Sequence, residues 1–530
     1  MRTRVTDKVR LFYSTLSFLI IMTLANGCNS SDQHKVVTWP HGVYYEIFVQ
    51  SFYDSNGDGI GDINGLTQKL DYIQDLGVNG VWLMPIMPSP SYHKYDVTDY
   101  KGIHPDYGTV EDFKKFVDEA HKRDLKVIID LIMNHCSMRH PWFVDAVENP
   151  KGPYRDYFLW ADKDSIANEI AKKTTTLDSD NITQWHAVEG DEKGEHYYGF
   201  FNRDMPDLNF DNPAVRKEFV EIGRYWFEDM KVDGFRLDAA KHIYPDDRAP
   251  DNHAFWAWFR GEMEKIKPDV YMVGEVWSPA EEVAPYLKGI PALFNFDLGV
   301  AIINAVNAEK DTNNLVKTYK TIADYYHGVT PEYLDATFLT NHDQNRIMSV
   351  LGNDPKKMRV AVALLMTLPG TPYIYYGEEL GMLGMKPDEH IREPFVWDKG
   401  NAVAGQASWI TPEYSTDQTI SPLSIQTADE GSLYNYYKNW IRLRNTSRAL
   451  SYGELNYSDI KKKEIISFVR EMENESDLII HNISNKTASV KLPEPMKRYS
   501  SIYYQSDTKA TIIDGQCTLP PYSTVILQPL

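Results

Sequence analysis

Residues 126–135 read KVIIDLIMNH, and this stretch indicates the fold. Its first six residues, Lys126–Leu131, form a nearly continuous apolar run instead of alternating apolar and polar side chains. Such a run is typical of a parallel strand that is covered on both faces. Asp130 lies in the run, and Asn134 and His135 follow it. We therefore predict a buried strand whose carboxyl end carries polar side chains.

Seven further segments show a similar short apolar run, and helical patterns lie between them. One of these, Thr109–Arg123, reads TVEDFKKFVDEAHKR, and its apolar residues recur with helical spacing. Eight strands that alternate with helices predict an α/β fold, a (β/α)8 barrel of the TIM type. The seven other strands are expected at Val43–Phe48, Val78–Pro85, Gly234–Asp238, Val270–Glu275, Leu293–Phe296, Thr337–Leu339 and Tyr373–Tyr376.

The strand spacing is uneven at one point, because about a hundred residues separate the third strand from the fourth. A structureless loop of that length is uncommon in a compact domain, so we predict a small inserted domain at the carboxyl face of the barrel. Short β-rich stretches near the end predict a C-terminal antiparallel β-sandwich. The expected boundaries are 1–27 for an export signal, 36–135 and 207–448 for the barrel, 136–206 for the insert, and 449–530 for the β-domain.

The composition excludes several classes of protein. The chain has 530 residues, with 55 Lys or Arg and 75 Asp or Glu, so its formal net charge is −20. This balance argues against a protein that binds nucleic acid by neutralising phosphates, and against charge-driven binding to anionic membranes. Three cysteines are too few for a disulfide framework. Aromatic residues make up 13% of the chain, which suits a packed core and also the apolar faces of sugars.

The N-terminus has the pattern of an export signal. Basic residues precede the apolar run Leu11–Ala25, which is shorter than the ~20 residues needed to span a bilayer. The run ends in LANGC, which resembles a bacterial lipobox, although Asn26 is not a usual residue there. The resemblance implies that Cys28 is lipidated and that this lipid anchor alone holds the exported protein to a bacterial membrane. The cell surface is one expected location. An ordinary signal peptide, with a periplasmic or secreted product, is the alternative.

Polar side chains gather at the expected ends of four strands. Besides His135, the segments are Gly234–His242 (GFRLDAAKH), Gly274–Trp277 (GEVW) and Asn341–Asp343 (NHD). The carboxyl ends of barrel strands meet at one face, where barrels of this type place their catalytic groups, so we expect one shared site. A single acid at a strand end is more often a cap or a turn former. Four such ends in this order are hard to attribute to chance.

In order and spacing, these segments resemble the sequence regions of glycoside hydrolase family 13, the α-amylase family. The resemblance covers Gly42 to about Trp397, and Met205–Asn209 (MPDLN) resembles a further family region just before the fourth strand. It implies a retaining glycosidase with an α-glucan as its substrate. Within the family, MPDLN resembles a group intermediate between oligo-1,6-glucosidases and neopullulanases. Residues Arg392–Asp398 resemble the oligo-1,6-glucosidase side of that group.

The resemblance implies that Asp238 is the nucleophile and Glu275 the acid/base, with Asp343 as a third carboxylate that holds substrate hydroxyls. In retaining glycosidases one carboxylate attacks the anomeric carbon, and a second carboxyl group protonates the leaving oxygen. Arg236 precedes Asp238 by two residues, so both side chains point to the same side of a strand, and its charge favours the ionised nucleophile. Clustering of carboxyl groups is expected to raise one pKa among them.

The same resemblance implies a set of substrate-binding side chains. Tyr95 is expected to stack on the sugar at the cleavage point, and Lys241 with His242 to contact the leaving side. Asp388 and Arg392 resemble a pair that grips the donor side, with a surface salt bridge as the alternative. The full expected set is Tyr95, His93, His135, Arg236, Lys241, His242, His342, Asp388 and Arg392.

Residues 54–62 read DSNGDGIGD, which places oxygen ligands at every second position and glycines at the tight turns. Hard cations such as Ca²⁺ are held by such ligands. The string resembles the start of an EF-hand loop without its final glutamate, and also a calcium-binding string of family 13. An Asp/Asn/Gly turn without metal is the alternative. The expected Ca²⁺ ligands are Asp54, Asn56, Asp58, the Ile60 carbonyl and Asp62.

The residue after the expected nucleophile bears on which bond is cut. Relatives that cleave α-1,6 bonds of short oligosaccharides usually carry Val there, whereas this chain has Ala239. We therefore expect an α-amylase that cleaves internal α-1,4 bonds of starch and maltooligosaccharides. Separately, we expect the protein to be a monomer. The alternatives are an α-glucosidase or oligo-1,6-glucosidase, a neopullulanase-like enzyme, a transglycosylase, and a starch-binding surface lipoprotein without activity.

Overall fold

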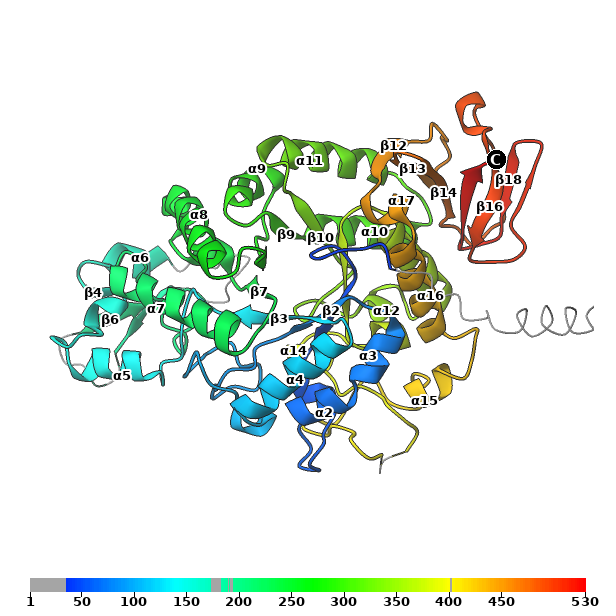
Figure 1. Ribbon diagram of the computed structural model, residues 1–530. Helices are drawn as coiled ribbons and strands as arrows, with labels where there is room; N and C mark the ends of the chain where they lie inside the picture. Colours follow the sequence, from blue (N-terminus) through cyan, green and yellow to red (C-terminus); the bar gives the residue numbers. More distant parts are fainter. Residues whose placement is uncertain (1–34, 173–182, 189, 191–193, 401–402) are drawn as a thin grey trace, which may run out of the picture. The chain divides into compact units, whose positions relative to one another are not determined.

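The computed structural model describes residues 35–172, 183–188, 190, 194–400 and 403–530. Residues 37–530 form one compact unit, and every contact given below lies within it. At its centre is a closed barrel of parallel strands in the order β1-β11-β10-β9-β8-β7-β3-β2, which confirms the predicted (β/α)8 barrel (Figure 1). The barrel strands are β1 (Tyr44–Ile47), β2 (Gly80–Leu83), β3 (Lys126–Leu131), β7 (Gly234–Leu237), β8 (Tyr271–Gly274), β9 (Ala292–Asn295), β10 (Leu334–Thr337) and β11 (Thr371–Tyr375).

The barrel strands are apolar on both faces because each face packs against other side chains. Tyr44 and Trp82 belong to a core cluster that fills the interior of the barrel, and the Tyr44 ring stacks on Tyr373 at 5.2 Å. The next residue of β1, Tyr45, belongs to the larger core between the strands and the surrounding helices. This two-sided burial explains why the strand sequences read as continuous apolar runs.

Helices cover the outside of the barrel. Helix α4 (Val110–Lys122) begins at Thr109, whose side chain forms a reciprocal capping box with Asp112. Helix α7 (Pro213–Arg224) continues into a π-helical turn over Tyr225–Asp229. The other helices in and around the barrel are α2 (Ile63–Gln68), α3 (Leu70–Leu76), α8 (Ala249–Ile266), α9 (Ala280–Val283), α10 (Phe296–Ala308), α11 (Leu315–Val329), α12 (Ile347–Val350), α13 (Pro355–Thr367), α14 (Asp388–Ile391), α15 (Leu423–Gln426), α16 (Leu433–Thr446) and α17 (Arg448–Tyr452).

One predicted strand lies three residues too late. The apolar run Thr337–Leu339 was expected to form it, but β10 ends at Thr337, and the buried Phe338 and Leu339 follow the strand. The charged Asp335 interrupts the apolar pattern within β10 itself. The apolar run therefore marks burial at this position and not the strand.

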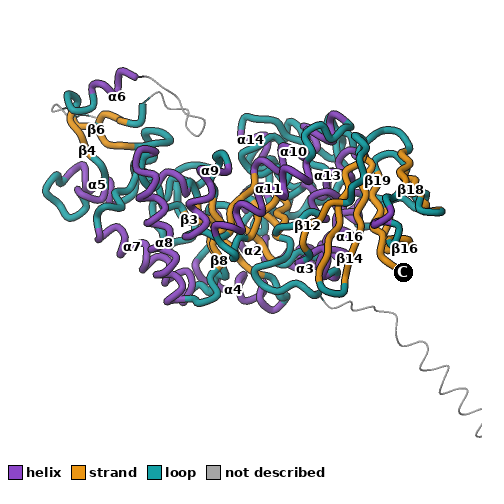
Figure 2. The backbone as a smooth tube through the Cα atoms, turned by 90° about the horizontal axis from the view of Figure 1, so that it is seen from above, coloured by secondary structure: helices purple, strands orange, loops and turns teal. Residues whose placement is uncertain are grey.

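The segment between β3 and β7 contains a small antiparallel sheet in the order β4-β6-β5. Isolated bridges join His135 to Asp207 and Phe158 to Leu208, so the base of the insert is tied to the end of β3. Figures 1 and 2 both show this sheet and the C-terminal strands on opposite sides of the barrel. The elements of the insert are α5 (Pro141–Glu148), β4 (Trp160–Asp162), α6 (Ala167–Lys172), β5 (Trp185–Ala187) and β6 (Glu195–Tyr198).

The C-terminal segment forms two antiparallel sheets, in the orders β12-β13-β14-β19-β16 and β15-β18-β17. Side chains of both sheets share one apolar core, which includes Leu478 and Leu519, as expected for a β-sandwich. The predicted boundary before residue 449 falls inside α17, and the domain limits stay predictions. The strands are β12 (Glu454–Tyr457), β13 (Ile465–Met472), β14 (Glu475–Asn482), β15 (Ala488–Lys491), β16 (Tyr499–Gln505), β17 (Thr511–Ile513), β18 (Gln516–Leu519) and β19 (Ser523–Pro529).

The β-domain is joined to the barrel at the carboxyl end of α13. Arg444 donates hydrogen bonds to the carbonyl oxygens of Met366 (2.7 Å) and Leu368 (2.9 Å). Arg470, from β13, donates to the carbonyl oxygen of Thr367 at 2.7 Å. Carbonyl groups in the last turn of a helix lack helical partners, so these arginines satisfy them.

The chain reaches the barrel at the amino ends of its strands. The Trp39 ring packs edge-on against Tyr44 and Tyr271, and Lys126 lies over it at 5.6 Å. These three partners are the first residues of β1, β8 and β3. The residues just before β1 therefore lie at the face of the barrel opposite to its carboxyl ends.

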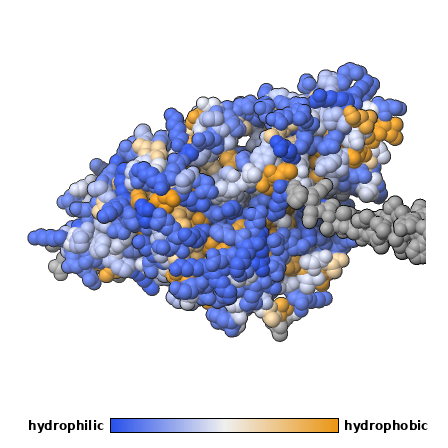
Figure 3. All heavy atoms as spheres, viewed as in Figure 1, coloured by the Kyte–Doolittle hydropathy of each residue, from blue (hydrophilic) through white to orange (hydrophobic). Residues whose placement is uncertain are grey.

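The visible surface is mostly hydrophilic, with small separate apolar patches, one of them over the C-terminal strands (Figure 3). Within the described ranges, the structure contains no helix with the length and apolar character needed to cross a membrane. The predicted export signal, residues 1–27, and the predicted lipidation site Cys28 lie outside the described residues.

Candidate active site

The polar side chains predicted at the strand ends meet in one cleft at the carboxyl face of the barrel. Arg236 lies in β7, Asp238 follows β7 directly, and Glu275 follows β8. Asp343 lies in the loop after β10. The cleft has a volume of about 570 Å³, and its lining includes His93, Tyr95, His135, Phe201, Asn202, Met205, Asp238, Ala239, Lys241, His242, Glu275, Trp277, Asp343, Lys386, Asp388 and Arg392.

Arg236 binds the two carboxyl groups that are expected to do the chemistry. Its Nη1 donates to Asp238 Oδ1 at 2.5 Å, and its Nη2 donates to Glu275 Oε2 at 2.5 Å. Nη1 also donates to Asp130 Oδ1 at 2.9 Å. The guanidinium is 1% exposed, so its position is fixed by packing as well as by these bonds. One rigid cation therefore holds the nucleophile and the acid/base candidates in a fixed relation.

Glu275 has the protonation behaviour that a general acid requires. Burial raises its pKa to about 7, and the negative charges of Asp238 and Asp343 act in the same direction, while Arg236 opposes them. A carboxyl group with this pKa is substantially protonated near neutral pH, so it can give a proton to a leaving oxygen. Burial likewise raises the pKa of Asp130 to about 7.

His342 lies between two carboxylates. Its Nδ1 is 2.5 Å from Glu46 Oε1, and its Nε2 is 3.0 Å from Asp343 Oδ2. Burial opposes a charge on His342, but Asp343 and Glu46 together raise its pKa to about 10. For Asp343, burial opposes ionisation, and His342 and Arg392 hold its pKa well below the usual range. Asp343 is therefore an ionised hydrogen-bond acceptor in the cleft.

Aromatic and imidazole rings form one wall of the cleft. The Tyr95 ring stacks on His342 at 5.8 Å, and its hydroxyl group lies 2.7 Å from His342 Nε2. The His93 ring lies 5.9 Å from the Tyr95 ring, and burial lowers the pKa of His93 to about 4. A neutral His93 and a flat Tyr95 ring suit contact with the apolar face of a sugar.

His135 and the side chains after β7 line the other parts of the cleft. His135 is buried, burial lowers its pKa, and its Nε2 has no hydrogen-bond partner among the described residues. The His242 ring stacks on Phe200 of the insert at 4.0 Å. Lys241 Nζ reaches Glu282 at 4.0 Å. The predicted Lys-His pair is thus held between the barrel and its neighbouring loops at the rim.

The Asp388–Arg392 pair is part of the cleft. Arg392 Nη2 donates to Asp343 Oδ1 at 3.0 Å and to Asp388 Oδ2 at 3.2 Å. Asp388 also pairs with Lys386 at 2.9 Å. Because Arg392 touches Asp343 directly, the pair is linked to the expected catalytic groups and is not a separate surface salt bridge.

Several side chains of the site were not singled out from the sequence. Glu46 lies within the apolar run of β1, and a charged residue in such a run is the signal that could have identified it. Asp207 accepts hydrogen bonds from the Phe200 amide (2.9 Å) and from Asn134 Nδ2 (3.2 Å), which ties the insert to the end of β3. Trp277, two residues after Glu275, is 49% exposed in the cleft and stacks on Phe296 at 4.5 Å.

The predicted calcium loop is closed by hydrogen bonds of its own. Asp54 accepts from the amides of Asn56, Gly57 and Gly59, and Asp62 accepts from Ser55 and Gly65. In the parts of the chain that the structure describes, no three Asp, Glu, His or Cys side chains converge as they would around a metal ion. The other three expected ligands are Asn56, the Ile60 carbonyl and Asp58, whose Oδ1 accepts from the Ile60 amide. The donor types fit Ca²⁺, but the arrangement is that of a hydrogen-bonded turn.

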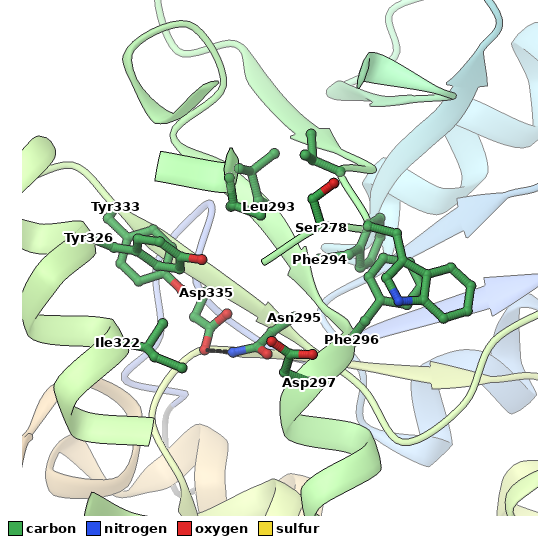
Figure 4. Close-up of a pocket in the computed structure, with 13 residues that line it drawn as sticks. Ser278, Leu293, Phe294, Asn295, Phe296, Asp297, Ile322, Tyr326, Tyr333 and Asp335 are labelled. Carbon is green, nitrogen blue, oxygen red and sulfur yellow. Dashed lines mark hydrogen bonds between the residues drawn. The ribbon is translucent and has the colours of Figure 1, made fainter. Parts of the chain in front are cut away.

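A second, much smaller pocket shares one lining residue, Trp277, with the cleft. Figure 4 shows this small pocket, with Asn295 and Asp335 among its lining residues. Its volume of about 30 Å³ is room for a water molecule or two. Asn295 Nδ2 donates to Asp335 Oδ2 at 3.0 Å, and Tyr326 and Tyr333 lie near Asp335 in the close-up. The pocket is too small for a sugar ring, so the larger cleft is the candidate for substrate binding.

Comparisons with known proteins agree with this geometry. The family "Alpha amylase, catalytic domain" matches residues 46–453, and the family "Alpha-amylase SusG C-terminal domain" matches residues 465–526. The first match spans more than half of the chain and contains all of the cleft residues named above.

Three similar proteins illustrate the range of relatives. "Alpha-amylase 3" of Dictyoglomus thermophilum is 40% identical over 526 residues, which cover 98% of this chain and 99% of that protein. The 4-alpha-glucanotransferase of Thermotoga maritima is 33% identical over 447 residues, which cover 83% and 96%. The crystal structure of an alpha-amylase from H. orenii superposes with a TM-score of 0.82 at 42% identity, covering 92% of this chain and 99% of that one.

Proposed function

We infer that this chain, which belongs to the alpha-amylase family, is a retaining enzyme that cleaves internal α-1,4-glucosidic bonds of starch and maltooligosaccharides. One observation carries the proposal: the buried Arg236 binds both Asp238 and Glu275 at 2.5 Å in an open cleft. A pair of carboxyl groups held side by side is the equipment of a retaining glycosidase.

The first step breaks the glycosidic bond. An oxygen of Asp238 attacks the anomeric carbon, and the bond from that carbon to the leaving oxygen breaks. Glu275, protonated because burial raises its pKa to about 7, transfers its proton to the leaving oxygen. The products are a glycosyl ester on Asp238 and a sugar chain with a new hydroxyl group.

The second step returns the enzyme to its starting state. Glu275, now ionised, takes a proton from a water molecule whose oxygen attacks the anomeric carbon. The ester bond to Asp238 breaks, and the two carboxyl groups recover their original protonation states. Asp343, which His342 and Arg392 keep ionised, accepts hydrogen bonds from hydroxyl groups of the sugar that reacts.

Product analysis on soluble starch tests the proposal. We expect a mixture of maltooligosaccharides and a rapid fall in iodine staining, because internal bonds are cut. Glucose as the sole product would instead indicate an α-glucosidase. If no product forms, the protein is a starch-binding protein and not a hydrolase.

A 4-α-glucanotransferase is the second candidate. The exposed Trp277 ring at the rim of the cleft offers a platform on which a sugar acceptor can compete with water for the glycosyl ester. The Thermotoga maritima relative carries this activity in its name. Incubation with pure maltotriose separates the candidates, since a transferase forms chains longer than the substrate and a hydrolase forms shorter chains.

We propose further that the loop over residues 54–62 binds Ca²⁺ through Asp54, Asn56, Asp58, the Ile60 carbonyl and Asp62. The alternating oxygen donors support this, although the loop would have to exchange part of its own hydrogen bonds for the ion. Thermal unfolding with added calcium or a chelator is the test, with Asp58→Asn as the variant. An unchanged melting temperature in all samples would show that the loop is a turn without metal.

We also propose that the protein is exported and anchored to a bacterial membrane through lipid on Cys28. The sequence pattern LANGC after an apolar run supports this proposal. Labelled fatty acid should attach to the wild-type protein and not to Cys28→Ala. Label on both proteins, or on neither, would contradict it.

The enzyme is proposed to act as a monomer, divided into a barrel (36–135 and 207–448), an insert (136–206) and a C-terminal β-domain (449–530). Arg236, Asp238, Glu275 and Asp343 meet within one barrel, so the proposed reaction needs no residue from a second copy. Sedimentation equilibrium of the exported form checks this, and a dimer mass at working concentration would contradict it.

A further inference from the structure

Glu46 is a buried acid that the proposed reaction does not use. It lies in β1 among apolar residues and is 1% exposed. It is not among the residues that line the cleft. Its Oε1 lies 2.5 Å from Nδ1 of His342, which is itself fully buried. Burial of a charged group costs free energy unless the group is paired, so a buried acid is expected to have a specific partner. Here that partner is His342.

The other nitrogen of His342 determines what this contact means. His342 Nε2 lies 3.0 Å from Asp343 Oδ2 and 2.7 Å from the Tyr95 hydroxyl group. A neutral imidazole carries one N–H and one bare nitrogen, and a bare nitrogen facing an ionised carboxylate is repelled. An imidazolium donates from both nitrogens. The placement of a carboxylate on each side therefore favours the doubly protonated ring.

We propose that Glu46 is a positioning residue that keeps His342 doubly protonated, and so directs the Nε2–H of His342 toward Asp343 at the cleavage point. Asp343 is then held in place and ionised from two sides, by His342 and by Arg392. The consequence for catalysis rests on the proposed function, whereas the charge state of His342 does not.

Rings and charged groups surround His342 and act on its charge. Arg392 Nε donates to the backbone carbonyl of His342, and the Trp82 ring lies edge-on at 5.6 Å. Burial opposes the charge, yet Asp343 and Glu46 raise the pKa of His342 to about 10. The titratable and charged groups around the His342–Glu46 pair are Tyr95, Asp130 on β3, Arg236 on β7, Glu275 after β8, Asp343, Arg392, and Tyr373 and Tyr375 on β11.

The first test measures the ring itself and needs no activity. In full-length protein with ¹⁵N-labelled histidine, the His342 signals are assigned by their loss in His342→Asn. We expect wild-type His342 to keep the nitrogen shifts of an imidazolium through neutral pH. In Glu46→Gln, which preserves the shape but removes the charge, the pKa should fall by about one unit or more. Identical titrations in the two proteins would overturn the proposal, even if the protein proved to have no activity.

The second test measures the effect on the reaction. Removal of Glu46 lowers the pKa of His342, so the imidazolium is lost as pH rises and recovered as pH falls. Because a pKa that falls from about 10 by about one unit leaves the ring charged near pH 7, the ratio of kcat/KM in Glu46→Gln to that of wild type should be nearly constant at neutral pH. The ratio should then fall as pH rises through about 9, toward a further loss of about tenfold. A loss of the same size at every pH would indicate packing alone and would overturn the proposal.

Two control variants show whether Glu46 acts through His342. In a His342→Asn background, Glu46→Gln should have little further effect, because the residue it acts upon is gone. A full additional loss in that background contradicts the proposal. Glu378→Gln removes another buried glutamate, which accepts a hydrogen bond from Tyr437 at 2.6 Å outside the cleft. Its kcat/KM ratio to wild type should not vary with pH.

Discussion

Two clusters, one around the buried Arg236 and one around the buried Arg444 and Arg470, differ in the chemical groups that bind the arginine side chains. In the cleft, Arg236 is bound by the carboxyl groups of Asp130, Asp238 and Glu275. Where the barrel meets the β-domain, Arg444 of the barrel helix α16 and Arg470 of β13 are bound by backbone carbonyl oxygens at the end of α13. All three arginines are almost completely buried. A buried arginine therefore has a different role where its partners can gain or lose a proton than where they cannot.

The pKa values of the arginines record the difference. Burial opposes the charge of Arg236, but Asp130 and Glu275 raise its pKa well above the usual value. For Arg444, burial and then the nearby Arg470 lower the pKa to about 9. Carboxyl partners can exchange protons and so can take part in a reaction. Carbonyl partners cannot, and they serve only to hold two parts of the chain together.

The largest expected effect comes from removing one charge of the cleft cluster. Asp238→Asn should lower kcat on starch by about 10⁴-fold or more, because the amide cannot form the glycosyl ester. Arg236 keeps two carboxyl partners, so the melting temperature should change little. Initial rates and thermal unfolding are the measurements. A variant that retains a tenth of the activity would show that Asp238 is not the nucleophile.

The reverse result is expected at the other cluster. Arg444→Met leaves the carbonyl groups of Met366, Leu368 and Gly370 without their buried partner. This should lower the free energy of unfolding by about 3 kcal/mol or more, because each unpaired buried group costs about 1–3 kcal/mol. Urea denaturation measures the loss, and kcat at 25 °C should stay within about twofold. A large loss of kcat in a folded variant would show that the clusters are not separate in function.

The pH dependence of activity sharpens the contrast. Glu275 must be protonated to act as the acid, and its pKa is raised to about 7, so kcat/KM should fall as pH rises through about 7. Because Arg236 lowers this pKa, weakening its contact in Arg236→Lys should move the alkaline limb to higher pH. In Arg444→Met the limb should not move. If the alkaline limb does not move in Arg236→Lys, the group whose titration causes the limb is not Glu275.

The smallest effect is expected at the rim of the cleft. Trp277→Ala removes an exposed ring that binds no charge and stabilises neither cluster. The loss of a stacking surface is worth about 1 kcal/mol, or roughly fivefold in binding. It should raise KM for short maltooligosaccharides and reduce transfer to sugar acceptors, while kcat for starch stays nearly constant. Trp258→Ala, on helix α8, is a matched control away from the cleft lining.

The barrel could be predicted from the sequence because its strands are covered on both faces. Continuous apolar runs such as Lys126–Leu131 followed directly from that burial. Asp238 and Glu275 could be assigned to a shared site because they lie at the ends of such runs, whereas their catalytic roles were inferred from the resemblance to the family. The strand near Thr337 was placed three residues late, since the charged Asp335 lies within β10 and apolar side chains follow it.

Other features depend on contacts between residues that are far apart in the sequence, or on a choice between structures that the same residues can form. Glu46 and His342 are 296 positions apart and meet only because β1 closes the barrel beside the later strands. The calcium string shows a different limit. Alternating Asp, Asn and Gly residues serve equally well to bind a cation or to close a turn by hydrogen bonds to the backbone. The sequence pattern of 54–62 is the same in both cases.

The packing of Trp39 sets the direction from which the enzyme can be held. Trp39 touches the first residues of β1, β3 and β8, whereas the cleft opens at the last residues of the strands. A support attached at residues 37–39, which belong to the same compact unit as the barrel, therefore meets the barrel on the side away from the cleft. Immobilised in this way, the enzyme presents its working face outward, toward a polymer too large to diffuse around it.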